Sequence, residues 1–515
     1  MASIGNMMLT DKYDLFRYKY LANFWRSNYY PLVFQVALAA IMIGMIYDGF
    51  FGSTSYAENT LTMGAFFAFW WGIIFVMGVM GRSWCAICPV GAISGAVNRF
   101  NRGFNFPRRL SNWALPAASY AILLWGLQLV FDWRTTPLAT TIWFVGIIGL
   151  AIGMGIMFKG RSFCKYMCPI TAPLAVMARI SPIEIRARTQ GSTYSETYIK
   201  NIPMLRNSEE KNRKNNIEST NSKKMIDPEC KECKTHDCAK GNEETEGCPW
   251  GQHPSVMIEN NACSMCMKCT HSCPSGQPMR LRLRNPLSEL SKVFRPNAGE
   301  IAIIMILLSY YSIWEWYTLA DTWFPGTSTI LIDGLSSALP FFTPDNIEYY
   351  LVGTFMTIGI VLGLYSLASY GSTKISKTRF KVNFNNYGYA YLFIFILPLP
   401  LSVTIGYVPY YGEFANMALN HLGINMNLSD GFVFQDFIIY KNSDYDIKFT
   451  ETLYAFPVLF AIPIGIYLVI RISKNILDKH ATNKSLIMTG LPHMVLIALF
   501  TLLAFYSSIQ SVINY

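Results

Sequence analysis

The sequence predicts a polytopic α-helical membrane protein with about nine transmembrane helices and a cysteine-rich domain inserted between the fourth helix and the fifth. Three observations lead to this fold class. Only 14% of the 515 residues are charged, whereas about a quarter are charged in an average soluble protein. Several apolar runs reach the length of about 20 residues that a bilayer-crossing helix needs. Eight of the 12 cysteines lie between Cys230 and Cys273, and no cysteine follows them.

The predicted transmembrane helices are the long uninterrupted apolar runs of the chain. Aromatic residues such as Trp133, Trp316 and Tyr410 lie near their ends, as is typical of side chains at a membrane–water interface. The nine predicted spans are 30–48, 62–80, 112–131, 138–158, 299–320, 349–369, 387–409, 452–472 and 486–512.

The charges of the connecting segments predict the orientation of the chain. Basic residues gather before span one and between spans two and three, six and seven, and eight and nine, and the alternate connections are acidic or neutral. Because cytoplasmic loops carry the excess of Lys and Arg, we expect a cell-membrane protein with its N-terminus and inserted segment in the cytoplasm and its C-terminus outside. This distribution also accounts for the net charge of +10, so we expect no nucleic-acid partner.

The chain divides into five predicted regions. The polar stretch 207–224 has almost no apolar residue and is interpreted as a linker. Arg280, Arg282 and Arg284 follow the last cysteine and are interpreted as contacts to lipid head groups. The regions are 1–29 (cytoplasmic N-terminus), 30–158 (four transmembrane helices with a first Cys-Pro motif), 159–226 (a second Cys-Pro motif and the linker), 227–286 (the cysteine-rich domain) and 287–515 (five transmembrane helices with two long outer loops).

An internal repeat places paired cysteines at the ends of two predicted spans. The segment 81–92, GRSWCAICPVGA, is echoed by 160–172, GRSFCKYMCPITA. The first copy follows span two and the second follows span four, so two helical hairpins deliver their cysteines to the same membrane face. The paired residues are Cys85 with Cys88 and Cys164 with Cys168.

The strongest motif is the run Cys263-x2-Cys266-x2-Cys269-x3-Cys273-Pro274. Three thiolates at this spacing can wrap one iron–sulfur cube, and the fourth, before proline, reaches the other cube of a pair. Zinc is the alternative, but it favours two separated Cys-x2-Cys pairs. The run therefore predicts iron–sulfur ligation.

A second set of cysteines precedes this run with similar spacing. It reads Cys230-x2-Cys233-x4-Cys238, followed by Cys248-Pro249. Region 227–286 is thus predicted to be a ferredoxin-type domain with two 4Fe-4S clusters whose fourth ligands are exchanged. Cluster 1 would be bound by Cys230, Cys233, Cys238 and Cys273, and cluster 2 by Cys263, Cys266, Cys269 and Cys248.

The chemistry of the four Cys-Pro motif cysteines stays open. Four thiolates suit a third iron–sulfur cluster, a zinc ion or copper(I), and unligated cysteine can also pack as a small apolar side chain. A disulfide is not expected in a reducing cytoplasm. Iron–sulfur is the leading interpretation for Cys85, Cys88, Cys164 and Cys168.

The chain resembles the membrane polyferredoxin family, which includes the quinol-dehydrogenase subunit of periplasmic nitrate reductase systems, the nitrous oxide reductase regulator and the copper-reducing cytochrome oxidase maturation protein. The resemblance covers about residues 60–285. It rests on the eight cysteines of region 227–286 and on the motifs that end in Cys88-Pro89 and Cys168-Pro169. It implies electron transfer linked to quinone or to a redox partner protein. The five C-terminal spans have no counterpart in this resemblance.

These features predict an electron-transfer protein. Electrons would pass between a cytoplasmic or quinone-pool donor and a membrane or extracytoplasmic redox partner protein. The chain could act as a quinol-linked oxidoreductase subunit, but the absence of a nucleophile–base arrangement favours an electron-transfer component. The alternative function is reduction or delivery of a metal such as copper during maturation of a membrane oxidase.

His493 is the only histidine deep in a predicted span. A haem would normally need two axial ligands, and a second intramembrane histidine is missing. We therefore expect no haem and interpret His493 as a partner in a hydrogen bond between helices.

Overall fold

The computed structural model describes two compact units. The cysteine-rich unit comprises Met1–Leu38, Met77–Ala92 and Met177–Pro286, and the helical unit comprises Ala39–Val76, Ile93–Val176 and Leu287–Tyr515. The described residues are 14–27, 29–65, 69–107, 110, 114–120, 136–187, 235–254, 257, 260–273, 279–291, 299–309, 347–398, 419–420, 456–477 and 482–514.

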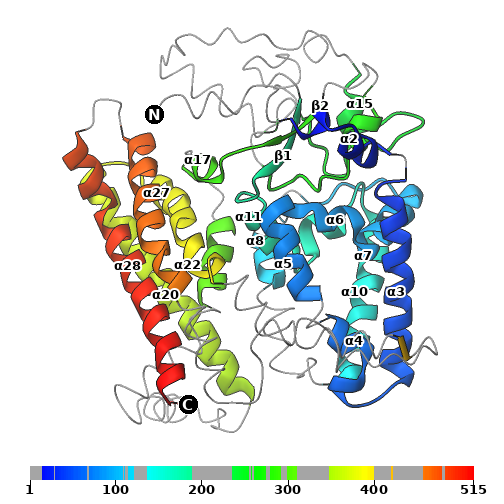
Figure 1. Cartoon of the computed structure of the whole chain (residues 1–515), viewed down its shortest axis with the longest axis horizontal. Coiled ribbons are helices and arrows are strands. Elements are labelled where there is room, and N and C mark those ends of the chain that lie inside the picture. The colour runs from blue at the N-terminus through cyan, green and yellow to red at the C-terminus, as the bar shows by residue number, and fades with distance from the viewer. Residues whose placement is uncertain are drawn as a thin grey trace. The chain divides into compact units, whose positions relative to one another are not determined.

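A two-stranded antiparallel sheet supports the cysteine-rich unit (Figure 1). Strand β1 (Ile183–Ala187) pairs with β2 (Met279–Leu283), with Ile185 opposite Leu281. Along β2, Met279 and Leu281 are buried while the arginines between and after them are partly exposed. This alternation matches the two-residue period of a strand with one face on a core.

The core of this unit joins segments that are far apart in the sequence. Buried side chains from the N-terminal segment, including Phe16, pack with Met265 and Met267 of the cysteine run and with Leu281 of β2. Tyr30 donates a hydrogen bond to the carbonyl of Met265 over 3.3 Å. The helices of this unit are η2 (Leu15–Arg17), α2 (Lys19–Trp25), η5 (Gly81–Ser83), α6 (Trp84–Ile87), α15 (Asp237–Lys240) and α16 (Lys268–His271).

Long apolar helices confirm the membrane class. Among the described residues, four helices are long and apolar enough to cross a bilayer, or five if a pair bent by 40° (Gly72–Ile87 and Pro89–Phe100) counts as one span. The four are Leu32–Phe51, Pro137–Met157, Phe456–Ile476 and Asn483–Tyr506. The predicted spans 112–131, 299–320 and 387–409 lie partly outside the described residues, so the count of nine stays a prediction.

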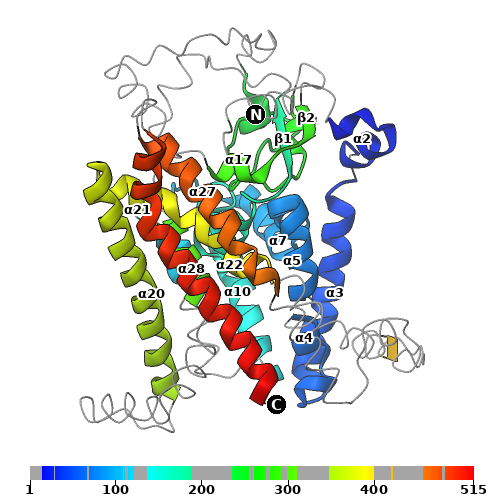
Figure 2. The same cartoon turned by 60° about the vertical axis from the view of Figure 1, so that its left-hand side comes forward.

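The C-terminal part of the helical unit is a bundle. Helices α20 (Ile347–Ser376) and α27 (Ala461–Ile476) both pack along α28 (Asn483–Asn514) (Figures 1 and 2). Gly465 on α27 lies so close to α28 that an added Cβ would meet Ile497 at 3.0 Å. Close backbone approach at small residues is the usual way in which membrane helices associate. The bundle also holds α21 (Phe380–Tyr387), η9 (Gly388–Tyr391) and α22 (Leu392–Ile396).

The other described elements are two long helices and several shorter ones. Helix α10 (Pro137–Met157) packs against α4 (Thr60–Met63), and Asp48 accepts hydrogen bonds from the backbone and hydroxyl of Thr60, both at 2.6 Å. The other elements are α3 (Leu32–Phe51), η3 (Tyr56–Glu58), α5 (Phe69–Met80), α7 (Pro89–Val97), η6 (Asn98–Phe100), α8 (Ala114–Ser119), η8 (Phe163–Met167), α11 (Thr171–Met177) and α17 (Pro286–Leu290).

His493 confirms the predicted hydrogen bond between helices. Its Nδ1 lies 2.9 Å from the hydroxyl of Tyr391, and its ring stacks on Tyr387 with 4.3 Å between centroids. Tyr387 is the last residue of α21 and Tyr391 the last residue of η9, whereas His493 lies on α28. The histidine therefore ties two segments of the bundle together.

Candidate iron–sulfur site

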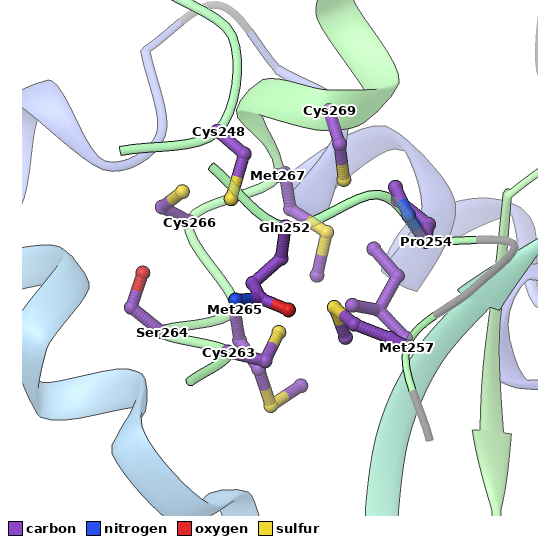
Figure 3. A pocket seen from close by; sticks show the side chains of 11 residues that line it. Cys248, Gln252, Pro254, Met257, Cys263, Ser264, Met265, Cys266, Met267 and Cys269 are labelled. Carbon is purple, nitrogen blue, oxygen red and sulfur yellow. The ribbon is translucent and has the colours of Figure 1, made fainter. Parts of the chain in front are cut away.

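Four of the predicted ligands surround one cavity of the cysteine-rich unit. Cys263, Cys266 and Cys269 line it together with Cys248, which is fifteen residues before the first of them in the chain (Figure 3). The cavity encloses about 340 Å³, including space open to solvent. These are the four cysteines that the exchange pattern groups as cluster 2. The remaining lining residues are Ile185, Gln252, Pro254, Met257, Ser264, Met265 and Met267.

The backbone of the run turns sharply between its cysteines. Met265 and Met267 have φ angles of 53° and 60°, a left-handed conformation that is uncommon outside glycine. Both side chains are buried in the core of the unit. Such strained residues cluster at ligand-binding sites. These two turns allow Cys263, Cys266 and Cys269, which lie within seven consecutive residues, to face the same cavity.

Burial disfavours free thiolates around the cavity. Burial, with a smaller effect from Cys266, raises the pKa of Cys248 to about 12. Burial also raises the pKa of Cys263 to about 11, although Arg186 lowers it in part. Deprotonation of these buried thiols therefore needs a compensating positive centre, which a bound iron–sulfur cluster supplies.

The donors are arranged for a group larger than one ion. Among the residues that the structure describes, no three His, Cys, Asp or Glu side chains are close enough together to hold a single metal ion. A structural zinc would need four sulfurs at about 2.3 Å from one point. Four cysteines spread around a cavity instead suit a cube ligated at its four corners.

A buried hydroxyl also fits a cluster in this cavity. Ser264 is 2% exposed, and its Oγ has no hydrogen-bond partner among the described residues. An unsatisfied buried hydroxyl costs about 1–3 kcal/mol. A sulfur acceptor in the cavity would remove this cost, because hydrogen bonds to sulfur are a normal part of cluster sites.

The cluster 1 ligands are described only in part. Cys238 is buried on α15 and Cys273 is half-buried after α16, but neither lines the cavity. Cys230 and Cys233 lie outside the described residues. The grouping of these four cysteines stays a prediction.

A pair of neighbouring histidines in this unit was not predicted from the sequence. His253, which is 4% exposed, places its Nε2 3.4 Å from Nδ1 of His236. Burial, followed by the nearby His236, lowers the pKa of His253 to about 4. The two histidines are 17 positions apart, and no motif connects them.

The two Cys-Pro motifs have similar local geometry in different units. Cys88 donates its amide to the carbonyl of Trp84, and Cys168 donates to Phe163, both over 2.9 Å. The four cysteines are half-buried and form no disulfide. Cys85 and Cys88 belong to the cysteine-rich unit, whereas Cys164 and Cys168 belong to the helical unit.

The arginines on β2 and directly after it do not make the expected contacts. Arg282 lies 2.7 Å from Glu184, and Arg284 donates to the carbonyls of Ala178, Arg179 and Ser181, each over 2.8 Å. The interpretation of these two arginines as lipid contacts is wrong, because a buried carboxylate binds Arg282 and backbone carbonyls bind Arg284. Arg280 likewise pairs with Asp14 over 2.9 Å.

A comparison with known protein families found matches over both copies of the internal repeat. A family model described as a 4Fe-4S binding domain matches residues 62–107 and again 139–188. Each matched segment contains one Cys-Pro motif. The matches support an iron–sulfur electron-transfer role. They also agree with a polyferredoxin-like protein.

The matched segments lie outside region 227–286, so the cavity and the matches are independent indications of iron–sulfur binding. Comparisons with curated proteins and with solved structures gave no match.

Proposed function

We propose that this protein is a membrane-bound electron-transfer protein. It passes electrons between a cytoplasmic or quinone-pool donor and a membrane or extracytoplasmic redox partner. The observation that carries the proposal is the cavity lined by Cys248, Cys263, Cys266 and Cys269. The apolar helices and the two 4Fe-4S family matches support it.

The residues around the cavity have separate roles in this proposal. Cys248, Cys263, Cys266 and Cys269 hold one 4Fe-4S cluster, which supplies single-electron chemistry when bound. Met265 and Met267 exclude water from one side, since they are 3% and 1% exposed. Ser264 donates a hydrogen bond to sulfur. Water exclusion and hydrogen bonding are two of the means by which a protein adjusts the reduction potential of such a site.

The other cysteines provide ligands for further iron–sulfur binding in this proposal. Cys238 and Cys273, with Cys230 and Cys233, hold the second cluster. The pairs Cys85 with Cys88 and Cys164 with Cys168 are further candidate iron ligands, and the family matches over both motifs support iron rather than zinc or copper(I) there.

The excess of Lys and Arg in alternate loops supports one orientation of the protein in the membrane. The N-terminus and the cysteine-rich unit lie in the cytoplasm, and the C-terminus lies outside. A quinone or a redox partner protein then exchanges electrons at the membrane.

Iron and sulfide analysis of the anaerobically purified full-length protein tests the proposal, together with low-temperature EPR after dithionite reduction. Two clusters contribute about eight irons and three contribute about twelve. Fewer than four irons, with zinc in their place, would contradict electron transfer.

Two matched variants test the ligand exchange. Cys248→Ser removes the signal of the cavity cluster, and Cys273→Ser removes the other one. Loss of the same signal in both variants would contradict the exchange.

The copper alternative has its own test. If the protein binds copper(I) tightly, and if Cys85→Ser and Cys164→Ser abolish this binding, a role in metal reduction or maturation would be favoured instead.

A further inference from the structure

Arg82 of the first Cys-Pro motif is inserted between two loops of the cavity. It is 1% exposed, and its Nη1 donates to the carbonyl of Asn261 over 2.6 Å. Its guanidinium also lies 4.0 Å from the centre of the Trp250 ring. Trp250 follows Cys248 by two residues, and Asn261 precedes Cys263 by two. One side chain therefore bridges the separate segments that bring Cys248 and Cys263 to the same cavity.

The backbone before Arg82 is fixed in place. Gly81 has a φ of 60°, and an added Cβ would lie 3.2 Å from Cα and Cβ of Ala178. The carbonyl of Val79 accepts a hydrogen bond from Ser181 Oγ over 2.7 Å. Arg284 in turn binds the carbonyls of Ala178 and Ser181. Close packing at a glycine thus directs the next residue, Arg82, into the loops.

The second copy of the motif provides a comparison within the same chain. Gly160 also has a positive φ, of 71°, and Arg161 is also buried. However, Arg161 packs beside Gly95, within 3.2 Å of the position of an added Cβ, and both residues belong to the helical unit. The same Gly-Arg-Ser sequence therefore positions its arginine in two different environments.

We propose that Arg82 is a positioning residue of the cavity, which holds the Cys248 and Cys263 loops in register and links them to Cys85 three residues away. The inference rests on the proposed function, because it requires a cluster in the cavity. A buried guanidinium favours the more negative, reduced state of a nearby cluster, since a low-dielectric interior screens its charge weakly.

The test uses the full-length protein, purified anaerobically in detergent, with the variants Arg82→Gln, Arg82→Lys and Arg161→Gln. Cys248→Ser first identifies the EPR signal of the cavity cluster. The midpoint potential of that signal and the iron content are then measured for each variant.

We expect Arg82→Gln to shift this midpoint to a more negative potential, with at least a tenfold change in the reduction equilibrium, or about 59 mV for one electron. Arg82→Lys should restore part of the shift, because it keeps the charge. Arg161→Gln should leave the cavity signal unchanged. If Arg82→Gln loses the cavity signal alone and Arg82→Lys recovers it, positioning is also supported.

Three outcomes would overturn the inference. One is an unchanged midpoint in Arg82→Gln at full iron content. Another is an equal shift in Arg161→Gln. The third is loss of every cluster signal in both Arg82 variants, which would make Arg82 a general folding residue. Absence of any 4Fe-4S signal in the unmodified protein would instead contradict the proposed function.

Discussion

Glu184 on β1 and Arg282 on β2 face each other across the strand pair, with 2.7 Å between Oε1 of the carboxylate and Nε of the guanidinium. Arg186 adds a second ion pair at 3.1 Å and Arg284 a third at 3.6 Å. The Glu184 side chain is 5% exposed. One buried carboxylate thus compensates three arginines beside the cavity.

We predict that Glu184→Gln destabilises the cysteine-rich unit by about 3 kcal/mol, because removing one partner leaves buried charges uncompensated. Hydrogen exchange of β1 and β2 at neutral pH measures the loss. The control is Glu246→Gln, because the Glu246 side chain is 44% exposed in its ion pair with Lys268 and the loss of such a pair should cost less than about 1 kcal/mol. Equal effects of the two variants would contradict the prediction.

The stabilisation that Glu184 provides should depend on pH in a definite direction. Burial alone would raise the pKa of Glu184, but Arg186, Arg282 and Arg284 together lower it below 4.5. The stabilisation is therefore fully present above the unfolded pKa of 4.5 and is lost as the pH falls through the lower folded value. The difference between the unmodified protein and Glu184→Gln should stay constant from pH 7 to pH 5.

His253 predicts a loss of stability on mild acidification. Its folded pKa of about 4 lies below the unfolded value of 6.5, so the unfolded chain binds a proton first as the pH falls. The free energy of unfolding should decrease by about 2 kcal/mol between pH 7 and pH 5 from this group alone. Urea unfolding followed by tryptophan fluorescence should show a weaker pH dependence for His253→Gln. Identical pH profiles would refute this role of His253.

Ser264→Ala should change the potential of the cavity cluster without releasing iron. Removal of one hydrogen bond to sulfur, worth about 0.5–1.5 kcal/mol, would shift the midpoint by roughly 20–60 mV to more negative values. EPR-monitored redox titration measures the shift. Ser291→Ala is a suitable control, because its hydroxyl donates to the carbonyl of Ser288. An unchanged midpoint at full iron content would exclude the hydrogen bond.

Tyr391→Phe should weaken the C-terminal bundle by about 1 kcal/mol, because the variant removes the hydrogen bond to His493. The thermal midpoint of the protein in detergent micelles reports the loss. Tyr370→Phe is the control, since that side chain is 52% exposed on α20. The absorption spectrum should show no haem band in either variant, and a haem band lost with His493→Phe would refute the structural role of His493.

Much of the candidate site could be predicted because cluster ligation depends on short distances along the chain. The Cys263–Cys273 run, with its proline, predicted both the cofactor and the partner role of Cys248. The structure brings Cys248 to the cavity of Cys263, Cys266 and Cys269. The role of Arg82 could not be predicted in the same way, because Trp250 and Asn261 are more than 160 residues from it along the chain.

The sequence by itself determined the membrane class and predicted a grouping for the four cysteines that line the cavity, because apolar length and ligand spacing are local properties. The tertiary structure alone decided that Phe16 and Tyr30 of the N-terminal segment pack into the cysteine-rich core. It also decided that Arg282 binds Glu184, that Arg284 binds backbone carbonyls, and that Arg82 enters the cavity loops. These contacts follow from long-range burial, which satisfies charges and backbone groups with partners that no local pattern specifies.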